Sequence, residues 1–489
     1  MIKAFLSLFS GNLFSKILGL IREALLAWAF GLSATAAAIR IAIAAIFVPM
    51  NLLTQDLLAA GYLPLYNEYK KQDPILAKQY AQFFTLLMLL IGFSITITLW
   101  PIAQAWISLL ASGLTPDTQA LAAKLFRILL LGVPFILTAS AATYALMAEG
   151  RYSLQSLRPS MQNLGLIAGI LLSSFTDSLL SIAWAYVSSQ ILFCAIAIWQ
   201  VRYRVSTKTN RMLPWRKFSN ALWTVIKPLL VLPLALQGYI ILERNVASWL
   251  GESTIAALEI SKFISETSMA LLAVPMGLVL LSRYTTEDEE RSSQIIQQIL
   301  IVLTLLITPV ATVLITYPEV IVQLLFQRGA FTPEDTELTS HVLRLFGAGL
   351  LIHTLNYQLL KLANAFQRSK DFAIASLIGI AAGAIGLLNY RTLGELTFGT
   401  AYILYGTGTL LYLSYQLRCT LKISRQLSYV LLWLFIARIV TKGLGIDSFT
   451  FKIFAAAGVT AVAIIIIALP YIFTHRTLDI KQWSKSDTR

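Results

Sequence analysis

Charged residues are scarce in this chain of 489 residues. Asp, Glu, Lys and Arg make up 13% of the sequence and hydrophobic residues 57%, whereas charged residues make up about 25% of soluble domains. The mean hydropathy of +0.72 likewise excludes an ordinary soluble protein. With 2 Cys and 3 His, and no metal-ligand spacing among them, the chain lacks a disulfide framework, and we expect no metal site.

Apolar runs long enough to span a membrane recur along the whole chain. A spanning helix needs roughly 20 such residues. Fourteen runs can be drawn, at 4–30, 34–66, 79–111, 118–148, 153–175, 178–201, 219–250, 254–283, 293–326, 335–367, 371–389, 394–417, 426–441 and 452–474. No connection between them is long enough for a catalytic domain. The sequence therefore predicts an all-α integral membrane protein with about 14 transmembrane helices that is not an enzyme.

Basic residues gather in alternate connections between these runs. With the N-terminus inside, 23 Lys and Arg fall in cytoplasmic segments and 4 outside, and the first group includes Arg151 and Arg158. The positive-inside rule then places both termini in the cytoplasm. The net charge of +14 is explained by this topology, so we expect no nucleic-acid partner.

The longest basic connection divides the chain into two halves. It predicts a six-helix lobe at 1–201, a cytoplasmic linker at 202–218, a second six-helix lobe at 219–417, and two further helices with a tail at 418–489. A short internal repeat supports this division, because Gly31-Leu-Ser-Ala-Thr-Ala-Ala follows the first run and Gly251-Glu-Ser-Thr-Ile-Ala-Ala follows the seventh.

Several charges lie inside the apolar runs, where each costs about 2.5–3.5 kcal/mol at a helix centre. At helical spacing they form polar stripes on the first and eighth runs, with more charges on the second and seventh. The polar and charged residues are Asn12, Ser15, Lys16, Gly19, Arg22 and Glu23 on the first run, Arg40 and Asp56 on the second, Lys227, Glu243 and Arg244 on the seventh, and Glu259, Lys262, Ser265 and Glu266 on the eighth. One interpretation is ion pairing between helices, with Lys262 bound to Glu259 or Glu266 and Arg22 bound to Glu23 or Glu243. The other is a water-filled cavity for a phosphate-bearing ligand, since arginine binds phosphate oxygens bidentately.

Four segments resemble the MurJ (MviN) family of lipid II flippases. They are Ser15-Lys-Ile-Leu-Gly-Leu-Ile-Arg-Glu-Ala24, Leu63-Pro-Leu-Tyr-Asn-Glu-Tyr69, Glu243-Arg-Asn-Val-Ala-Ser-Trp-Leu-Gly251 and, most specific, Leu325-Phe-Gln-Arg-Gly-Ala-Phe-Thr-Pro-Glu-Asp-Thr336. The resemblance implies two six-helix lobes around a central cavity, plus two C-terminal helices. It also implies a flippase in a bacterial inner membrane that carries a polyprenyl-pyrophosphate-linked glycan, by default lipid II, to the periplasmic leaflet by alternating access.

The charge stripes and the resemblance together predict the binding residues. We expect the pyrophosphate and head group to be bound by Arg22, Lys262, Arg244, Lys16 and Arg40, and these bases to be oriented by Glu23, Glu266, Glu259 and Glu243. No nucleotide-binding motif is present, so we expect no cofactor and a cycle driven by the membrane potential or an ion gradient. The implied partners are the lipid-linked glycan, membrane lipids and proteins of cell-wall or polysaccharide synthesis.

The chain also departs from the family pattern. Ala37 stands where the family has Asp, Thr54 and Gln55 stand where it has an Arg pair, and Phe263 stands where it has Arg. Lys16 and Glu23 replace Arg and Asp but keep the charge. A flippase for an exopolysaccharide or O-antigen precursor is therefore an alternative. A cation-coupled drug exporter and a non-transporting scaffold are weaker ones, because bases outnumber acids and because a scaffold needs no charged stripes.

Overall fold

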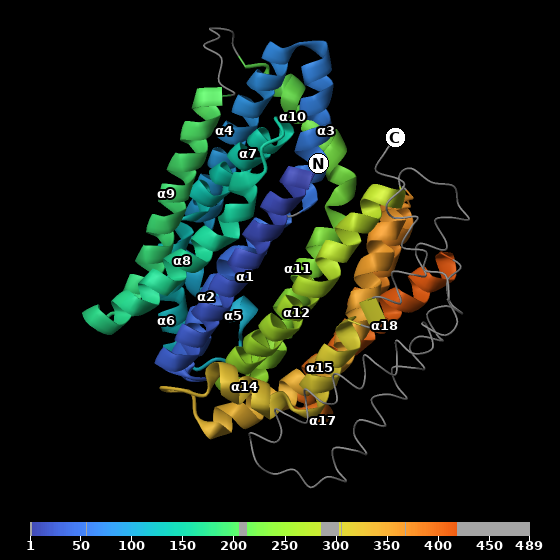
Figure 1. Ribbon diagram of the computed structural model, residues 1–489. Coiled ribbons are helices and arrows are strands. Elements are labelled where there is room, and N and C mark those ends of the chain that lie inside the picture. The colour runs from blue at the N-terminus through green and yellow to red at the C-terminus, as the bar shows by residue number, and fades with distance from the viewer. Residues whose placement is uncertain are drawn as a thin grey trace. The chain divides into compact units, whose positions relative to one another are not determined.

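The computed structural model describes residues 2–54, 56–204, 213–284, 303–304, 306–366 and 368–417 (Figure 1). In this part of the chain the regular structure is helical, without strands, which confirms the all-α prediction. The helices are α1 (Ile2–Phe30), α2 (Ala34–Thr54), α3 (Asp56–Gln72), α4 (Pro74–Leu99), α5 (Ala103–Leu110), α6 (Pro116–Leu130), α7 (Val133–Ala148), α8 (Ser153–Thr176), α9 (Leu180–Arg204), α10 (Trp215–Ile226), η1 (Lys227–Leu229), α11 (Val231–Leu250), α12 (Glu252–Tyr284), α14 (Pro318–Phe326), α15 (Pro333–Ala365), α16 (Ser369–Leu388), α17 (Tyr390–Leu393) and α18 (Leu396–Gln416).

Among the described residues, 5 helices are long and apolar enough to cross a membrane, and 8 spans result if each bent pair counts as one. The bent pairs are α6 with α7 at 45°, α10 with α11 at 65°, and Leu306–Thr316 with α14 at 86°. The predicted runs at 426–441 and 452–474 lie outside the described residues, so the count of 14 stays a prediction.

Proline explains where these bends fall. It lacks an N–H and its ring clashes with the preceding turn, so it is tolerated at the start of a helix and breaks the interior. Pro134 lies in the first turn of α7, Pro318 begins α14, and Pro228 lies in the short 3-10 turn η1. Each predicted run that contains such a proline is therefore split into two helices.

By their contacts, the residues fall into two compact units. The first comprises 1–263, 322–342 and 380–401, and the second comprises 264–321, 343–379 and 402–489. The first unit thus holds α1 to α11 and the beginning of α12. The lobe boundaries expected near residues 201 and 219 stay a prediction.

Within the first unit, α8 lies between α1 and α9 (Figure 1). Close packing of α8 on α9 depends on two glycines one turn apart. A Cβ added at Gly165 would lie 2.2 Å from the Ser189 Oγ, and one at Gly169 would lie 2.5 Å from the Ile182 Cα. Small residues at this spacing let membrane helices approach closely, so α1, α8 and α9 form one layer that holds the N-terminal polar stripe.

Hydrogen bonds join the end of α11 and the start of α12 to the connection before α6. Asn245 accepts hydrogen bonds from the backbone N–H and the hydroxyl of Ser112, at 3.1 and 2.8 Å. The Glu252 carboxylate accepts from the backbone N–H and the hydroxyl of Thr115, at 3.0 and 2.7 Å. These bonds tie the connection before α6 to the last turns of α11 and to the α11–α12 turn. The connection and the turn are predicted to lie outside the membrane.

At the opposite end of the first unit, α10 packs on an aromatic cluster carried by α3 and α4. The Phe218 ring lies 5.2 Å from the Tyr69 ring and 5.3 Å from the Tyr80 ring, centroid to centroid. Trp215 contacts Phe83 edge-on at 4.9 Å. The contact buries one face of α10, whose opposite face carries polar residues.

In the second unit, α15 and α18 are joined through backbone carbonyls. Asn356 donates from Nδ2 to the Gly406 carbonyl at 2.6 Å, and the His353 ring stacks on the Tyr402 ring with centroids 3.6 Å apart. A Cβ at Gly349 would lie 2.4 Å from the Tyr402 ring. Buried polar groups in this unit therefore satisfy helix carbonyls, as expected between helices in a bilayer.

Candidate anion-binding site

The polar stripe of α1 is centred on the buried carboxylate of Glu23. Its Oε1 accepts from the Arg22 Nη2 at 2.5 Å, and its Oε2 accepts from the Arg40 Nη1 of α2 at 2.6 Å. Glu23 is 4% exposed and Arg40 is 6% exposed. One carboxylate thus faces two guanidinium groups, so the cluster has an excess positive charge in a region of low dielectric.

Asn163 of α8 completes this cluster. Its Oδ1 accepts from the Arg22 Nη1 at 2.8 Å, while its Nδ2 donates to the Ser15 carbonyl at 3.0 Å. The asparagine therefore holds the Arg22 side chain against α1 and fixes the direction of the guanidinium fork. Asn163 is not among the residues predicted from the sequence, although an amide side chain inside an apolar run is a signal for such a position.

Several donors of the cluster have no acceptor. The Arg22 Nε, the Arg40 Nε and the Arg40 Nη2 are buried without a hydrogen-bond partner. A buried charged donor without an acceptor is costly, so such groups call for a reason. All three are guanidinium N–H groups, and an anion with several oxygen atoms is the ligand that satisfies them.

A second cluster of charges lies on α11 and α12. Arg244 Nη1 donates to Glu259 Oε1 at 2.6 Å, and Lys262 Nζ donates to Glu243 Oε2 at 2.5 Å. Bases and acids are equal in number here, so this cluster has no excess charge. The expected pair of Arg22 with Glu23 is confirmed, whereas the structure pairs Lys262 with Glu243, an acid that the sequence analysis had not assigned to it.

The two clusters lie within electrostatic reach of each other. Arg40 of α2 acts on the Glu259 carboxylate of α12, together with Arg244 and Lys262. A Cβ at Gly19 would lie 3.0 Å from the Phe263 ring, so α1 and α12 meet one turn before Arg22. The Phe263 ring lies in the space that is open because Gly19 of α1 has no side chain.

The other predicted site residues are placed as follows. Lys16 is half-buried on α1, and the described residues give it no hydrogen bond or ion pair. Glu266 is exposed on α12 and belongs to the second unit. Ala37 is fully buried one turn before Arg40, and the side chains of Thr54 and Gln55 lie outside the described residues. Across the described chain, no group of His, Cys, Asp and Glu fits a metal ion.

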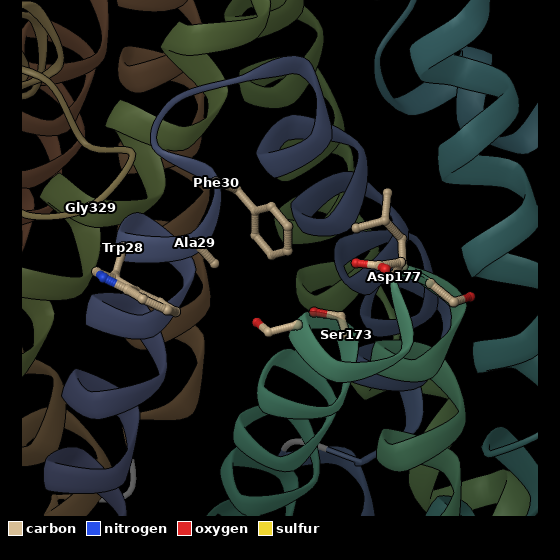
Figure 2. Close-up of a pocket in the computed structure, with 9 residues that line it drawn as sticks. Trp28, Ala29, Phe30, Ser173, Asp177 and Gly329 are labelled. Atoms are coloured by element: carbon tan, nitrogen blue, oxygen red, sulfur yellow. The ribbon is translucent and has the colours of Figure 1, made fainter.

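A pocket of about 440 Å³ lies elsewhere in the first unit, where α1 and α8 end (Figure 2). Its lining includes the Trp28 and Phe30 rings, the Asp177 carboxylate and the hydroxyl of Ser173, with Gly329 at its edge. None of its nine lining residues is basic. The pocket therefore does not suit a phosphate, unlike the charge clusters.

A family model and curated relatives of this chain carry the same family description. The family model described as lipid II flippase MurJ matches residues 26–482. The probable lipid II flippase MurJ of Thermotoga maritima is 26% identical over 382 residues, which cover 76% of this chain and 75% of that protein. The lipid II flippase MurJ of Burkholderia cenocepacia is 24% identical over 372 residues, which cover 71% of this chain and 70% of the relative.

Solved structures agree on the fold. A lipid II flippase MurJ in an inward closed conformation superposes with a TM-score of 0.83 at 22% identity, over 95% of this chain and 99% of that chain. An inward-facing multidrug resistance MATE family transporter of the MOP superfamily gives a TM-score of 0.70 at 17% identity, over 83% and 96% of the two chains. The fold is thus that of a multi-pass membrane transporter, and the resemblance found in the sequence is confirmed. The chain belongs to the lipid II flippase MurJ family.

Proposed function

We propose that this protein is a flippase that moves lipid II, the undecaprenyl-pyrophosphate-linked precursor of peptidoglycan, from the cytoplasmic to the periplasmic leaflet. The observation that carries the proposal is the buried cluster of Arg22 and Arg40, whose guanidinium donors exceed the acceptors that Glu23 supplies. Membership of the flippase family gives the cargo class, and the cluster gives a place for its pyrophosphate.

The physical problem is the head group. Moving a pyrophosphate through hydrocarbon without compensating charges is prohibitive, so the head group needs a polar path while the lipid tail stays in the bilayer. Arg22 and Arg40 would bind phosphate oxygens, Asn163 would orient Arg22, and Glu23 would hold the two guanidinium groups together without ligand. Rocking of two lobes would expose this site to one leaflet at a time.

The remaining bases extend the same path. Lys16 has its charge available on the α1 stripe, whereas Arg244 and Lys262 are neutralised by Glu259 and Glu243 in this state. Phosphate oxygens that approach Arg244 or Lys262 would compete with these carboxylates. The balanced pairs would therefore contribute to binding in a conformation that separates base from acid, and Glu266 would act beside them on α12.

The membrane potential is a suitable driving force. With both termini in the cytoplasm, an anionic head group would move from the negative to the positive side. That movement is favoured by about 2.3 kcal/mol per charge per 100 mV. No cofactor is needed for such a cycle.

Reporter fusions after residues 210 and 489 should both behave as cytoplasmic, and a periplasmic signal from either would refute the orientation.

The test is a lipid II flipping assay in proteoliposomes. Arg22→Gln should reduce transport at least tenfold, because an ionic hydrogen bond is worth about 1.5–3 kcal/mol. Lys71→Gln is the matched control, since Lys71 is an exposed base at the end of α3. Absence of lipid II transport by the unaltered protein, with transport of another polyprenyl-linked glycan, would favour the exopolysaccharide or O-antigen alternative instead.

A further inference from the structure

Another arginine lies inside the first unit, on the second turn of α8. Arg158 donates from Nη1 to the Ser140 Oγ of α7 at 2.9 Å. The positive-inside pattern counts it with the cytoplasmic charges, but the structure places its guanidinium between two membrane helices. No carboxylate pairs with it among the described residues. A cation in this position without a counter-ion is costly and calls for a ligand.

Two uncharged groups beside Arg158 also lack a partner. Tyr186 of α9 is fully buried, and its hydroxyl has no hydrogen bond. A Cβ added at Gly165 of α8 would lie 3.1 Å from the Tyr186 Cα, so this tyrosine packs against the face of α8 that carries Gln162 one turn earlier. Gln162 lies one helical turn after Arg158, on the same face of α8, and its Nε2 is buried without an acceptor.

These groups share one chemical character. The guanidinium, the amide nitrogen and the phenol hydroxyl all present N–H or O–H donors. Among the described residues the amide nitrogen and the hydroxyl have no acceptor, and the guanidinium has no carboxylate. A set of hydrogen-bond donors with a positive charge does not favour a cation. A phosphate or pyrophosphate group supplies several oxygen acceptors and a negative charge, which satisfy the donors and neutralise the arginine together.

We propose that Arg158, Tyr186 and Gln162 form a second phosphate-binding subsite, distinct from the Arg22–Arg40 cluster. Arg158 is five residues closer to the start of α8 than Asn163, the residue that binds Arg22. With the predicted topology, the start of α8 is cytoplasmic, so a head group entering from the cytoplasm reaches this subsite before Arg22. The inference rests on the proposed function and adds an entry step to it.

The experiment measures binding to the purified full-length chain in detergent, with two probes. Inorganic pyrophosphate reports on the phosphate chemistry alone, and lipid II reports on the complete head group. Arg158→Gln removes the charge but keeps a donor for Ser140, and Tyr186→Phe removes only the hydroxyl. Arg151→Gln is the matched control, because Arg151 is an exposed base just before α8. Arg22→Gln is measured in parallel, and the melting temperature without ligand is recorded for every variant.

Arg158→Gln should weaken binding of both probes roughly tenfold or more, Tyr186→Phe should weaken it less, and Arg151→Gln should leave it unchanged. The melting temperature without ligand should stay the same or rise for Arg158→Gln, since an unpaired cation is removed. A lower melting temperature with unchanged affinities would mean that Arg158 is structural, and would overturn the inference.

The same measurements separate this inference from the proposed function. Loss of lipid II binding in Arg22→Gln but not in Arg158→Gln would overturn the subsite and leave the flippase proposal standing. If the unaltered protein binds pyrophosphate through Arg158 but does not bind lipid II, the subsite holds for free phosphates and the lipid II assignment fails.

Discussion

Replacing Glu23 by glutamine should destabilise this protein far more than replacing either arginine that binds it. Glu23 is the carboxylate of the cluster, and it accepts from Arg22 through one oxygen and from Arg40 through the other. In Glu23→Gln, two guanidinium groups would remain in the protein interior with no anion. Removal of one partner of a buried ion pair costs about 3–5 kcal/mol, so the free energy of unfolding should fall by at least that amount.

The arginine variants should behave differently because each leaves a balanced pair. Arg22→Gln retains the Glu23–Arg40 pair, and the Arg22 side chain is 24% exposed, so its removal should cost about 1 kcal/mol. Binding should nevertheless drop tenfold to about a hundredfold, since a charged donor to phosphate is lost. Stability and transport are therefore predicted to separate, with Glu23 dominating the first and Arg22 the second.

The assay pairs melting temperature in detergent with lipid II flipping, normalised to inserted protein. Glu23→Asp is the control, because it keeps the charge and should stay near the unaltered protein in both measurements. Equal losses of stability and transport in Glu23→Gln, Arg22→Gln and Arg40→Gln would refute the reasoning. Recovery of normal transport in an Arg22→Ala/Glu23→Ala double variant would show that Arg22 serves only to neutralise Glu23.

Three further expectations concern the rest of the first unit. Lys262→Met should be destabilising because Glu243 is left buried and without this ion pair. The double variant Lys262→Met/Glu243→Leu should restore the melting temperature. A double variant no more stable than the single one would contradict the pairing. At the α11–α12 turn, burial raises the pKa of the Glu252 carboxyl, but hydrogen bonds from Thr115 outweigh it and leave the pKa below its usual value. The contact should therefore stabilise the protein above about pH 4.5 and lose this effect as pH falls through the lowered pKa, and the melting temperature of Glu252→Gln should lack this component. Gly169→Leu should prevent close packing of α8 on α9 and reduce folded protein on size-exclusion chromatography, while Gly238→Ala, where a Cβ meets nothing within 4 Å, should be tolerated.

Much of the architecture could be predicted because the bilayer constrains it. Every backbone polar group must be satisfied inside the span, so apolar length alone indicates helices. The parts of the runs from 4–30 to 394–417 that the structure describes are mainly helical. Prolines lie at the three bends, but Pro49 and Pro159 lie inside unbroken helices, so proline alone does not predict a break. The bend angles of 45°, 65° and 86° depend on which neighbours pack beside each half. The sequence also indicated the stripe of Arg22 and Glu23, because helical periodicity places both on one face.

The partners of those charges were decided by tertiary structure. Helical spacing offered Glu259 and Glu266 to Lys262, but the crossing of α11 and α12 brings Glu243 within 2.5 Å. Asn163 and Arg158 gained their roles from the close contact of α8 with α1 and α7, which no local pattern specifies. Composition and periodicity determined which residues enter the membrane, since those depend on single helices. Which base meets which acid, and which donors remain unsatisfied, depends on distances between helices far apart in the chain, and only the folded structure sets these.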